Sequence, residues 1–168
     1  GYGLVYFLSD MLDAHLNKLS GKTVLISGAG NVALHAAEKA TQLKAKVITL
    51  SDSNGTLHNK SGFTRDQIEF IKELKSKTGT SLEACVEKFS ESSFSPGKTP
   101  WHIKADIALP CATQNELREK DAENLKKNGI LALAEGANMP CTAHAAKIIR
   151  ESNILYAPGK ASNAGGVA

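Results

Sequence analysis

A glycine-rich segment, Gly28-Ala-Gly-Asn-Val-Ala33, has the spacing G-x-G-x-x-A. It follows an apolar, β-branched run over 22–27 and opens a stretch over 31–43 in which small apolar residues recur at helical spacing. In a strand–turn–helix unit this pattern is typical of dinucleotide binding, because the glycines permit a tight turn and let a pyrophosphate approach the backbone. The N–H groups at the start of the helix favour phosphate there. Gly28 and Gly30 are therefore candidate cofactor-binding residues; the alternative is a tight turn that binds no ligand.

Asp52 stands just after a second expected strand over 46–50. A carboxylate at this point would accept hydrogen bonds from the 2′-hydroxyl of an adenosine ribose, which favours NAD. Ser53 can instead donate a hydrogen bond, and Lys75 or Arg65 could supply the positive charge that a 2′-phosphate needs. Asp52 could also simply form the turn before the Asn-Gly pair that follows. The residues by themselves leave NAD and NADP open.

Three more segments follow expected strands and combine small residues with amide side chains. They are Pro110-Cys-Ala-Thr-Gln-Asn115, Glu135-Gly-Ala-Asn138 and Pro158-Gly-Lys-Ala-Ser-Asn163. In an open α/β sheet, ligands bind at the carboxyl ends of the strands. An amide both donates and accepts hydrogen bonds, which suits a ribose or a carboxamide. Turns and helix caps use the same residues, but three such segments at one edge favour a binding site.

The elements that must position these segments alternate along the chain. We expect helices over 4–16, 31–43, 64–76, 81–89, 119–127 and 142–151, strands over 22–27, 46–50, 106–110, 130–134 and 154–157, and a loop over 90–100. This alternation predicts an α/β fold: a Rossmann-like, doubly wound, mostly parallel sheet with helices on both faces. The length predicts one domain, 1–168. Because elements begin and end abruptly at both termini, we expect that domain to be a fragment of a longer chain.

Composition excludes several classes of protein. The 168 residues include 20 Lys plus Arg and 17 Asp plus Glu, and the net charge of +3 is scattered, which does not indicate nucleic-acid binding. No apolar run is long enough for a membrane helix, and the first residues lack the basic segment of a signal peptide. Three widely spaced cysteines do not suggest a disulfide framework. We therefore expect a cytoplasmic protein without nucleic-acid or membrane partners.

Other catalytic patterns are missing from the sequence. Neither Gly-Lys-Thr triplet has the first glycine of a phosphate-binding P-loop, and there is no G-x-S-x-G or H-E-x-x-H motif. Cys141 and His144 are too few to form a zinc site, so no metal is expected. Nothing close in sequence would activate Cys111, and we expect Cys111 and Trp101 to serve packing.

Four segments together resemble the cofactor domain of hexameric glutamate dehydrogenases. They are Ser27–Ala33, Asp106–Leu117, Ala134–Pro140 and Ala157–Ala168, in the same order, and the similarity runs over the whole chain. The Asn-Ala-Gly-Gly-Val element is shared with the sister dehydrogenases for leucine, phenylalanine and valine. The Glu-Gly-Ala-Asn-Met-Pro and Pro-Gly-Lys-Ala-Ser-Asn stretches are similar to the glutamate branch.

The resemblance implies reversible, NAD(P)-dependent oxidative deamination of L-glutamate to 2-oxoglutarate and ammonia. It places Gly28, Gly30, Asn31 and Val32 at the pyrophosphate, Asp52 and Ser53 at the adenosine ribose, Ala112, Thr113 and Gln114 along the cofactor groove, Asn138 and Asn163 at the nicotinamide, and Val167 beside the substrate. The stretch over 51–55 together with Lys75 is similar to NADP-type bacterial and protist enzymes, so NADP is the expected cofactor and NAD the alternative.

The resemblance also implies that the catalytic residues belong to a separate N-terminal domain. We accordingly expect no catalytic residue in this chain, no turnover by the chain alone, and a homo-hexamer for the full enzyme. Two rival interpretations remain: a non-catalytic dinucleotide-binding module, and a sister dehydrogenase acting on an apolar amino acid. The amides of Gln114, Asn138 and Asn163 favour an enzyme, because a sensor need not keep groups at the nicotinamide.

Overall fold

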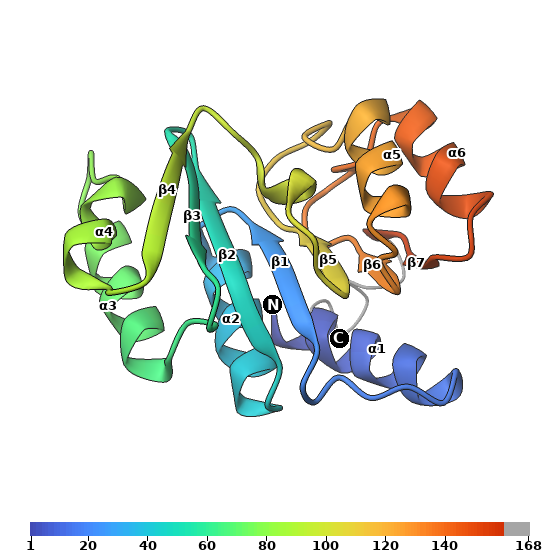
Figure 1. The fold of residues 1–168 in the computed structure, drawn as a ribbon, viewed down its shortest axis with the longest axis horizontal. Helices are drawn as coiled ribbons and strands as arrows, with labels where there is room; N and C mark the ends of the chain where they lie inside the picture. The colour runs from blue at the N-terminus through green and yellow to red at the C-terminus, as the bar shows by residue number, and fades with distance from the viewer. Residues whose placement is uncertain (160–168) are drawn as a thin grey trace.

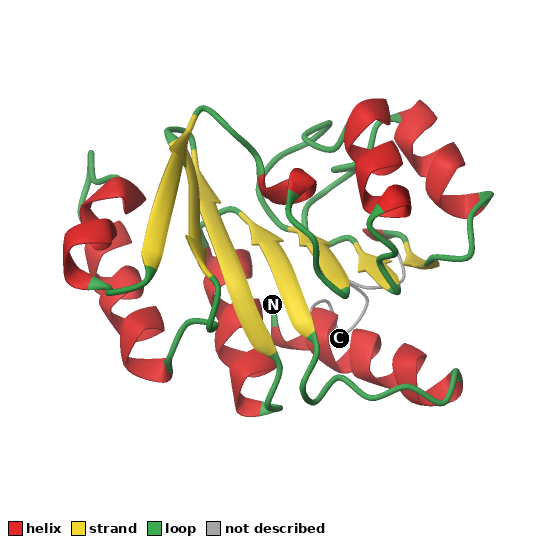
Figure 2. Cartoon of the chain, in the orientation of Figure 1, coloured by secondary structure: helices red, strands yellow, loops and turns green. Residues whose placement is uncertain are grey.

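The computed structural model describes residues 1–159, which form a twisted sheet covered by helices on both faces (Figures 1 and 2). The strands of this part of the chain are β1 (Thr23–Ser27), β2 (Lys46–Asp52), β3 (Gly55–Asn59), β4 (Ser92–Pro96), β5 (Ile107–Pro110), β6 (Ala132–Ala134) and β7 (Leu155–Ala157). Their order in the sheet is β4-β3-β2-β1-β5-β6-β7. The pairs formed by β1, β2, β5, β6 and β7 are parallel, and β3 pairs antiparallel with β2 and β4. The predicted Rossmann-like, mostly parallel α/β fold is confirmed.

Side chains alternate between the two faces of the sheet, and each face has its own set of helices. The helices are α1 (Tyr2–Ala14), α2 (Asn31–Gln42), α3 (Arg65–Lys75), α4 (Cys85–Lys88), α5 (Glu119–Lys127) and α6 (Ala143–Arg150), with 3₁₀ turns η1 (Leu82–Ala84) and η2 (Pro100–His102). Val24 and Ile26 of β1 pack with α1, α2 and α3, whereas Leu25 packs with η2, α5 and α6. This period of two is what a strand covered on both faces requires. No helix of the described part is long and apolar enough to cross a membrane.

Capping residues set the helix boundaries close to the predicted ones. The hydroxyl of Thr64 accepts the N–H of Gln67 at 3.1 Å, and the Gln67 side chain accepts the N–H of Thr64 at 2.9 Å, which is a capping box. Gly129 follows α5 with a φ of +74°, a conformation in which glycine is not strained. The helices predicted over 4–16 and 142–151 shift by one or two residues at their ends.

Two strands were missed. The sequence predicts a loop over 90–100, but this segment contains β4 and η2, and β3 follows β2 through a two-residue turn at Ser53 and Asn54. The serine-rich sequence of β4 has little intrinsic strand preference. Its conformation is determined by pairing with β3, in which Phe94 lies opposite Leu57. The loop prediction was wrong because the interaction that decides it is not local.

The helix predicted over 81–89 is broken into η1 and α4. At its start the Leu82 N–H donates to the carboxylate of Asp52 at 2.8 Å, and the Ser81 hydroxyl accepts the N–H of Glu83 at 3.2 Å. The first turn is thereby tightened into 3₁₀ form.

The order of the strands places a topological switch point between β1 and β5. The chain leaves β1 through α2 on one face to reach β2, and leaves β5 through α5 on the other face to reach β6. At such a switch point the connections diverge above the carboxyl ends of the two central strands, and ligands of open α/β sheets bind there. The glycine-rich turn after β1 and the loop after β5 both lie at this switch point.

Candidate dinucleotide-binding site

The turn between β1 and α2 packs directly against the loop after β5. Gly28 has a φ of +92°, and a Cβ added there would lie 2.9 Å from the carbonyl oxygen of Cys111. Its N–H donates to the hydroxyl of Ser51 at 2.8 Å, and its carbonyl accepts the Ser51 N–H at 3.2 Å. Glycine is required at position 28 both by the left-handed backbone and by this close approach.

Gly30 is different, because nothing in the described chain requires it to be glycine. Its φ of −85° suits any residue, and an added Cβ would meet no heavy atom within 4 Å. Gly30 caps α2, and the N–H groups of the first helical turn have no partner within the helix. The positive end of the helix therefore faces space that a side chain at position 30 would fill, and this arrangement fits a phosphate group.

The loop after β5 is tied to the end of β1. The Cys111 N–H donates to the Ser27 hydroxyl at 3.0 Å, and the carboxylate of Glu116 accepts the N–H groups of Ala112 at 2.8 Å and Thr113 at 3.0 Å. Burial raises the pKa of Glu116, while the hydrogen bonds from Ser27 and the two backbone groups oppose that shift. Ala112, Thr113 and Gln114 are exposed at this edge.

The loop after β6 reaches the same place. A Cβ on Gly136 would lie 2.5 Å from the sulfur of Cys111 and 3.4 Å from Val32. The N–H groups of Gly136 and Ala137 both donate to the carbonyl of Pro110 at 3.0 Å. Asn138 follows on an exposed turn. Loops from β1, β5 and β6 thus meet at one edge of the sheet, as the sequence predicts.

Glu135 joins β6 to the end of β7. Its buried carboxylate accepts the hydroxyl of Tyr156 at 3.0 Å and the N–H of Gly159 at 2.8 Å. Burial and the Glu135 charge raise the pKa of Tyr156. These bonds hold the point at which the third predicted segment begins. Asn163 and Val167 lie outside the described residues.

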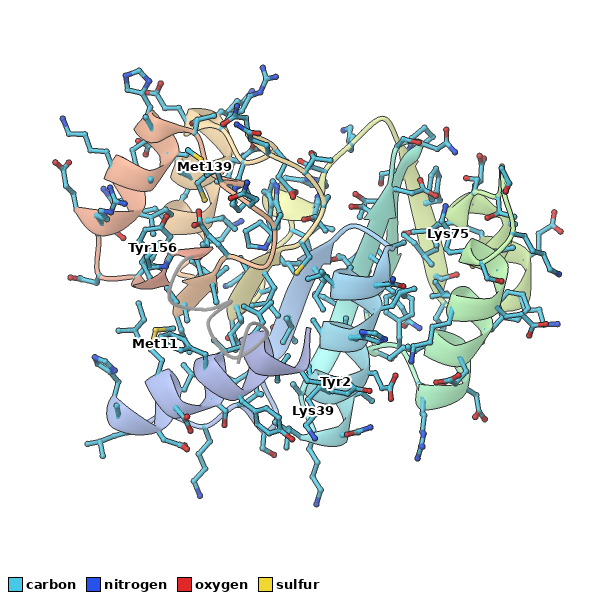
Figure 3. The ribbon with its side chains drawn as sticks, turned by 180° about the vertical axis from the view of Figure 1, so that it is seen from behind. Tyr2, Met11, Lys39, Lys75, Met139 and Tyr156 are labelled. Atoms are coloured by element: carbon cyan, nitrogen blue, oxygen red, sulfur yellow. The ribbon has the colours of Figure 1, made fainter. Side chains whose placement is uncertain are left out.

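Asp52 and Lys75 lie on the far side of α2 from these loops. The Asp52 carboxylate, only 8% exposed, accepts the N–H of Asn54 at 2.9 Å, the N–H of Leu82 at 2.8 Å and the ammonium of Lys75 at 3.3 Å. Lys75 also donates to the carbonyl of Thr80 at 3.0 Å, which leaves one of its three N–H donors for another acceptor. Figure 3 shows Lys75 at the end of its helix.

A pocket of about 220 Å³ connects Lys75 to the glycine turn. It is lined by Ala29, Gly30, Asn31, Leu34, His35, Lys72, Lys75 and Ser76. Lys72 forms an ion pair with Glu38, and Ser53 is exposed in the neighbouring hairpin turn. The pocket therefore joins a helix N-terminus to lysine ammonium groups, a combination that favours an anion.

The whole chain, residues 1–168, matches the family model described as Glutamate/Leucine/Phenylalanine/Valine dehydrogenase. The chain belongs to this dehydrogenase family. Over 168 residues it is 52% identical to the NADP-specific glutamate dehydrogenase of Psychrobacter sp. (strain TAD1) and 47% identical to the NAD-specific glutamate dehydrogenase of Bacteroides fragilis (strain YCH46). These alignments cover 100% of the chain and 37% and 38% of the two relatives.

The fold of this dehydrogenase family member is also that of a solved relative. The glutamate dehydrogenase of Plasmodium falciparum superposes with a TM-score of 0.95 and 41% sequence identity, over 99% of this chain and 36% of that one. The chain thus spans little more than a third of the length of the relatives it matches.

Three polar residues that support the site in this dehydrogenase domain were not singled out from the sequence. They are Ser27 at the end of β1, Ser51 in β2 and Glu116 after β5. The two serines bond the backbone of another segment, and Glu116 bonds the backbone of its own loop. A signal was present for the serines, since both are small polar residues at the ends of otherwise apolar strands. Glu116 follows an amide-rich turn and carries no local signal.

Cys111 and Trp101 are buried, which confirms their predicted packing roles. Burial strongly raises the pKa of the Cys111 thiol. All three cysteines are free thiols in the structure. Among residues 1–159, no three potential metal ligands are grouped, and Cys141 and His144 have no third partner of that kind.

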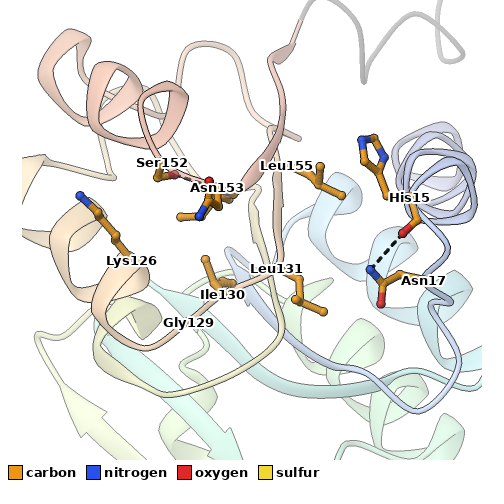
Figure 4. A pocket seen from close by; sticks show the side chains of 10 residues that line it. His15, Asn17, Lys126, Gly129, Ile130, Leu131, Ser152, Asn153 and Leu155 are labelled. Atoms are coloured by element: carbon orange, nitrogen blue, oxygen red, sulfur yellow. Dashed lines mark hydrogen bonds between the residues drawn. The ribbon is translucent and has the colours of Figure 1, made fainter.

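A cavity of about 590 Å³ lies at the amino-terminal ends of β6 and β7, whereas the glycine turn lies at the carboxyl end of β1 (the cavity is drawn in Figure 4). It is lined by His15 and Asn17 after α1, by Lys126 in the last turn of α5, and by the segments before β6 and β7. Its size does not make it the cofactor site, because the turns expected to bind phosphate are at the carboxyl ends of the strands.

Proposed function

We propose that this chain is the NADP-binding domain of a longer two-domain glutamate dehydrogenase. That enzyme converts L-glutamate, water and NADP to 2-oxoglutarate, ammonia and NADPH, reversibly. The observation that supports this most directly is the meeting of the loops after β1, β5 and β6 at Gly28, Cys111 and Gly136, two residues from Gly30, where the backbone leaves room for phosphate. The 52% identity to an NADP-specific glutamate dehydrogenase over the full chain supports the choice of substrate and cofactor.

The residues of the site divide along the length of a dinucleotide. In the proposed complex, Gly28, Gly30, Asn31 and Val32 bind the pyrophosphate, Asp52, Ser53 and Lys75 border the adenosine ribose, Ala112, Thr113 and Gln114 line the groove, Asn138 and Asn163 bind near the nicotinamide, and Val167 borders the substrate. A bound NADP supplies the hydride acceptor for oxidation of the amino acid. The part of this chain is to bind and orient it, since the amides both donate to and accept from a carboxamide.

The charge pattern beside Asp52 supports NADP over NAD. An unpaired carboxylate would repel a 2′-phosphate, but the Asp52 carboxylate already accepts two backbone N–H groups and the ammonium of Lys75. The remaining donor of Lys75, together with Ser53, is available to a phosphate. Relatives of similar identity carry NADP-specific and NAD-specific names, so this local geometry is the main support for NADP.

We further propose that the catalytic residues lie in a separate N-terminal domain and that hydride transfer requires closure of the cleft between the domains. The complete enzyme is proposed to be a homo-hexamer that works in the cytoplasm. The resemblance to the hexameric glutamate dehydrogenases supports these statements.

The test is a titration of the complete protein containing this chain with NADPH and with NADH, followed by the fluorescence of the reduced nicotinamide. Saturable binding that is tighter for NADPH is expected. Tighter binding of NADH would overturn the choice of NADP and assign the ribose to Asp52. Binding of neither by a folded protein would contradict the dinucleotide site.

An activity measurement then distinguishes the enzyme from its rivals. The complete protein should form NADPH from NADP only when L-glutamate is added. Intact binding without turnover of any amino acid would instead favour a non-catalytic dinucleotide-binding module. Faster turnover of leucine, phenylalanine or valine would indicate a sister dehydrogenase.

A further inference from the structure

The carboxylate of Glu116 accepts hydrogen bonds from the backbone of its own loop, the segment between β5 and α5. Its Oε2 atom accepts the N–H groups of Ala112 and Thr113, at 2.8 and 3.0 Å. Two successive backbone donors therefore point inward at one oxygen. This arrangement sets the direction of the peptide groups just ahead of Gln114.

The same carboxylate is linked to the end of β1. The buried hydroxyl of Ser27 donates to Glu116 and accepts the N–H of Cys111 at 3.0 Å. Ser27 is the last residue of β1 and immediately precedes Gly28. One cluster of hydrogen bonds thus connects the residue before the glycine turn with the loop opposite it.

The surroundings of Glu116 make its negative charge unfavourable in the folded state. Burial raises the pKa of Glu116, with a further contribution from Asp121 on α5, although three hydrogen bonds oppose the shift. A raised pKa means that the folded state favours the neutral carboxyl more than the unfolded state does. A group that works against stability in this way is found more often at functional sites than elsewhere.

We propose that Glu116 is a positioning residue, which fixes the loop of Ala112, Thr113 and Gln114 against the glycine turn in the position that dinucleotide binding requires. This inference rests on the proposed function. Glu116 does not itself contact the cofactor; it acts through the backbone of the loop and through Ser27.

The variants Glu116→Ala and Glu116→Gln separate this role from general stabilisation. Alanine removes the acceptor, whereas glutamine keeps one uncharged oxygen that can accept the same two N–H groups. For the complete protein we expect the Kd for NADPH to rise roughly tenfold in Glu116→Ala and by about threefold in Glu116→Gln. The melting temperature of Glu116→Gln should be unchanged or higher, because the buried charge is gone. Glu123→Ala, on the exposed face of α5, is the matched control and should alter neither.

Hydrogen exchange without cofactor provides a second readout. In Glu116→Ala the amides of Ala112 and Thr113 should exchange roughly tenfold faster, while those of β2 stay protected. A double-mutant cycle with Ser27→Ala should show that the effects on Kd are not additive, since both side chains belong to one cluster.

Three results would overturn the inference. Wild-type affinity in Glu116→Ala would show that the loop does not need this anchor. A lower melting temperature in Glu116→Gln with faster exchange throughout the chain would show a role in stability only. If the wild-type protein binds neither NADPH nor NADH, the proposed function fails first, and the positioning role fails with it.

Discussion

The ammonium of Lys75 lies 3.3 Å from the carboxylate of Asp52 and joins the end of α3 to the end of β2. Both side chains are largely buried, at 20% and 8% exposure. The pair places a positive group beside the glycine turn and offsets the negative group that would repel a phosphate. This relationship makes the cofactor preference testable by single substitutions.

Replacing Lys75 by glutamine should weaken NADPH binding more than NADH binding. A charge-assisted bond to the 2′-phosphate is lost, so the Kd for NADPH should rise by about tenfold to a hundredfold, and that for NADH by far less. Nicotinamide fluorescence titrations of both dinucleotides measure the difference. Lys18→Gln removes the same charge at an exposed position elsewhere and serves as control. Equal losses for both dinucleotides would contradict the assignment of Lys75 to the phosphate.

Asp52 should contribute mainly to stability. Its carboxylate accepts the N–H groups of Asn54 and Leu82 in addition to Lys75. Asp52→Asn leaves one oxygen and no charge, and we expect the free energy of unfolding to fall by about 1–3 kcal/mol. Urea denaturation measures this, with the exposed Asp13→Asn as control. If stability is unchanged and NADH affinity falls sharply, Asp52 binds the ribose instead.

The two glycines of the turn should respond in opposite ways to alanine. Gly28→Ala adds a Cβ 2.9 Å from the Cys111 carbonyl at a positive φ, so it should destabilise the fold by at least about 2 kcal/mol. Gly30→Ala adds its Cβ in open space at an ordinary φ, so the melting temperature should change little. Its Kd for NADPH should nevertheless rise roughly tenfold, because the methyl group occupies the approach of the pyrophosphate.

Thermal melts and titrations of both variants test this contrast. Wild-type affinity in Gly30→Ala would mean that the phosphates do not pass over this turn. A stable Gly28→Ala protein would mean that the loops after β1 and β5 can separate without loss.

The protein should lose stability on mild acidification partly through His58. Burial lowers the pKa of His58 on β3, and the charges of Lys60 and His102 lower it further. Below about pH 6.5 the unfolded chain therefore binds a proton that the folded chain resists. Above that pH the free energy of unfolding carries no penalty from His58. It decreases as the pH falls toward the pKa of His58 in the folded state.

Melting temperatures between about pH 7.5 and pH 5.5 test this expectation. The decrease on acidification should be smaller in His58→Gln than in the wild type, whereas the exposed His144→Gln should follow the wild type. Identical slopes in all three proteins would show that His58 does not carry the effect.

Much of the fold follows from local patterns. Apolar residues at helical spacing over 31–43 specify one helix, and the capping pair Thr64 and Gln67 marks the start of another. The glycine turn after β1 is recognisable from six consecutive residues. Each depends on neighbours along the sequence, which is why the strand–helix alternation and the edge that carries the site could be predicted.

Contacts between distant segments decided the rest. The serine-rich β4 is a strand because β3 lies beside it, and η1 begins where the Leu82 N–H bonds the carboxylate of Asp52. Gly136 and Cys111 meet only in the folded chain, as do Glu116 and Ser27. The sequence by itself determined which segments could bind a dinucleotide. Only the tertiary structure decided which polar groups hold those segments together, because a hydrogen bond between residues so far apart in the chain forms only after the sheet has brought their strands side by side.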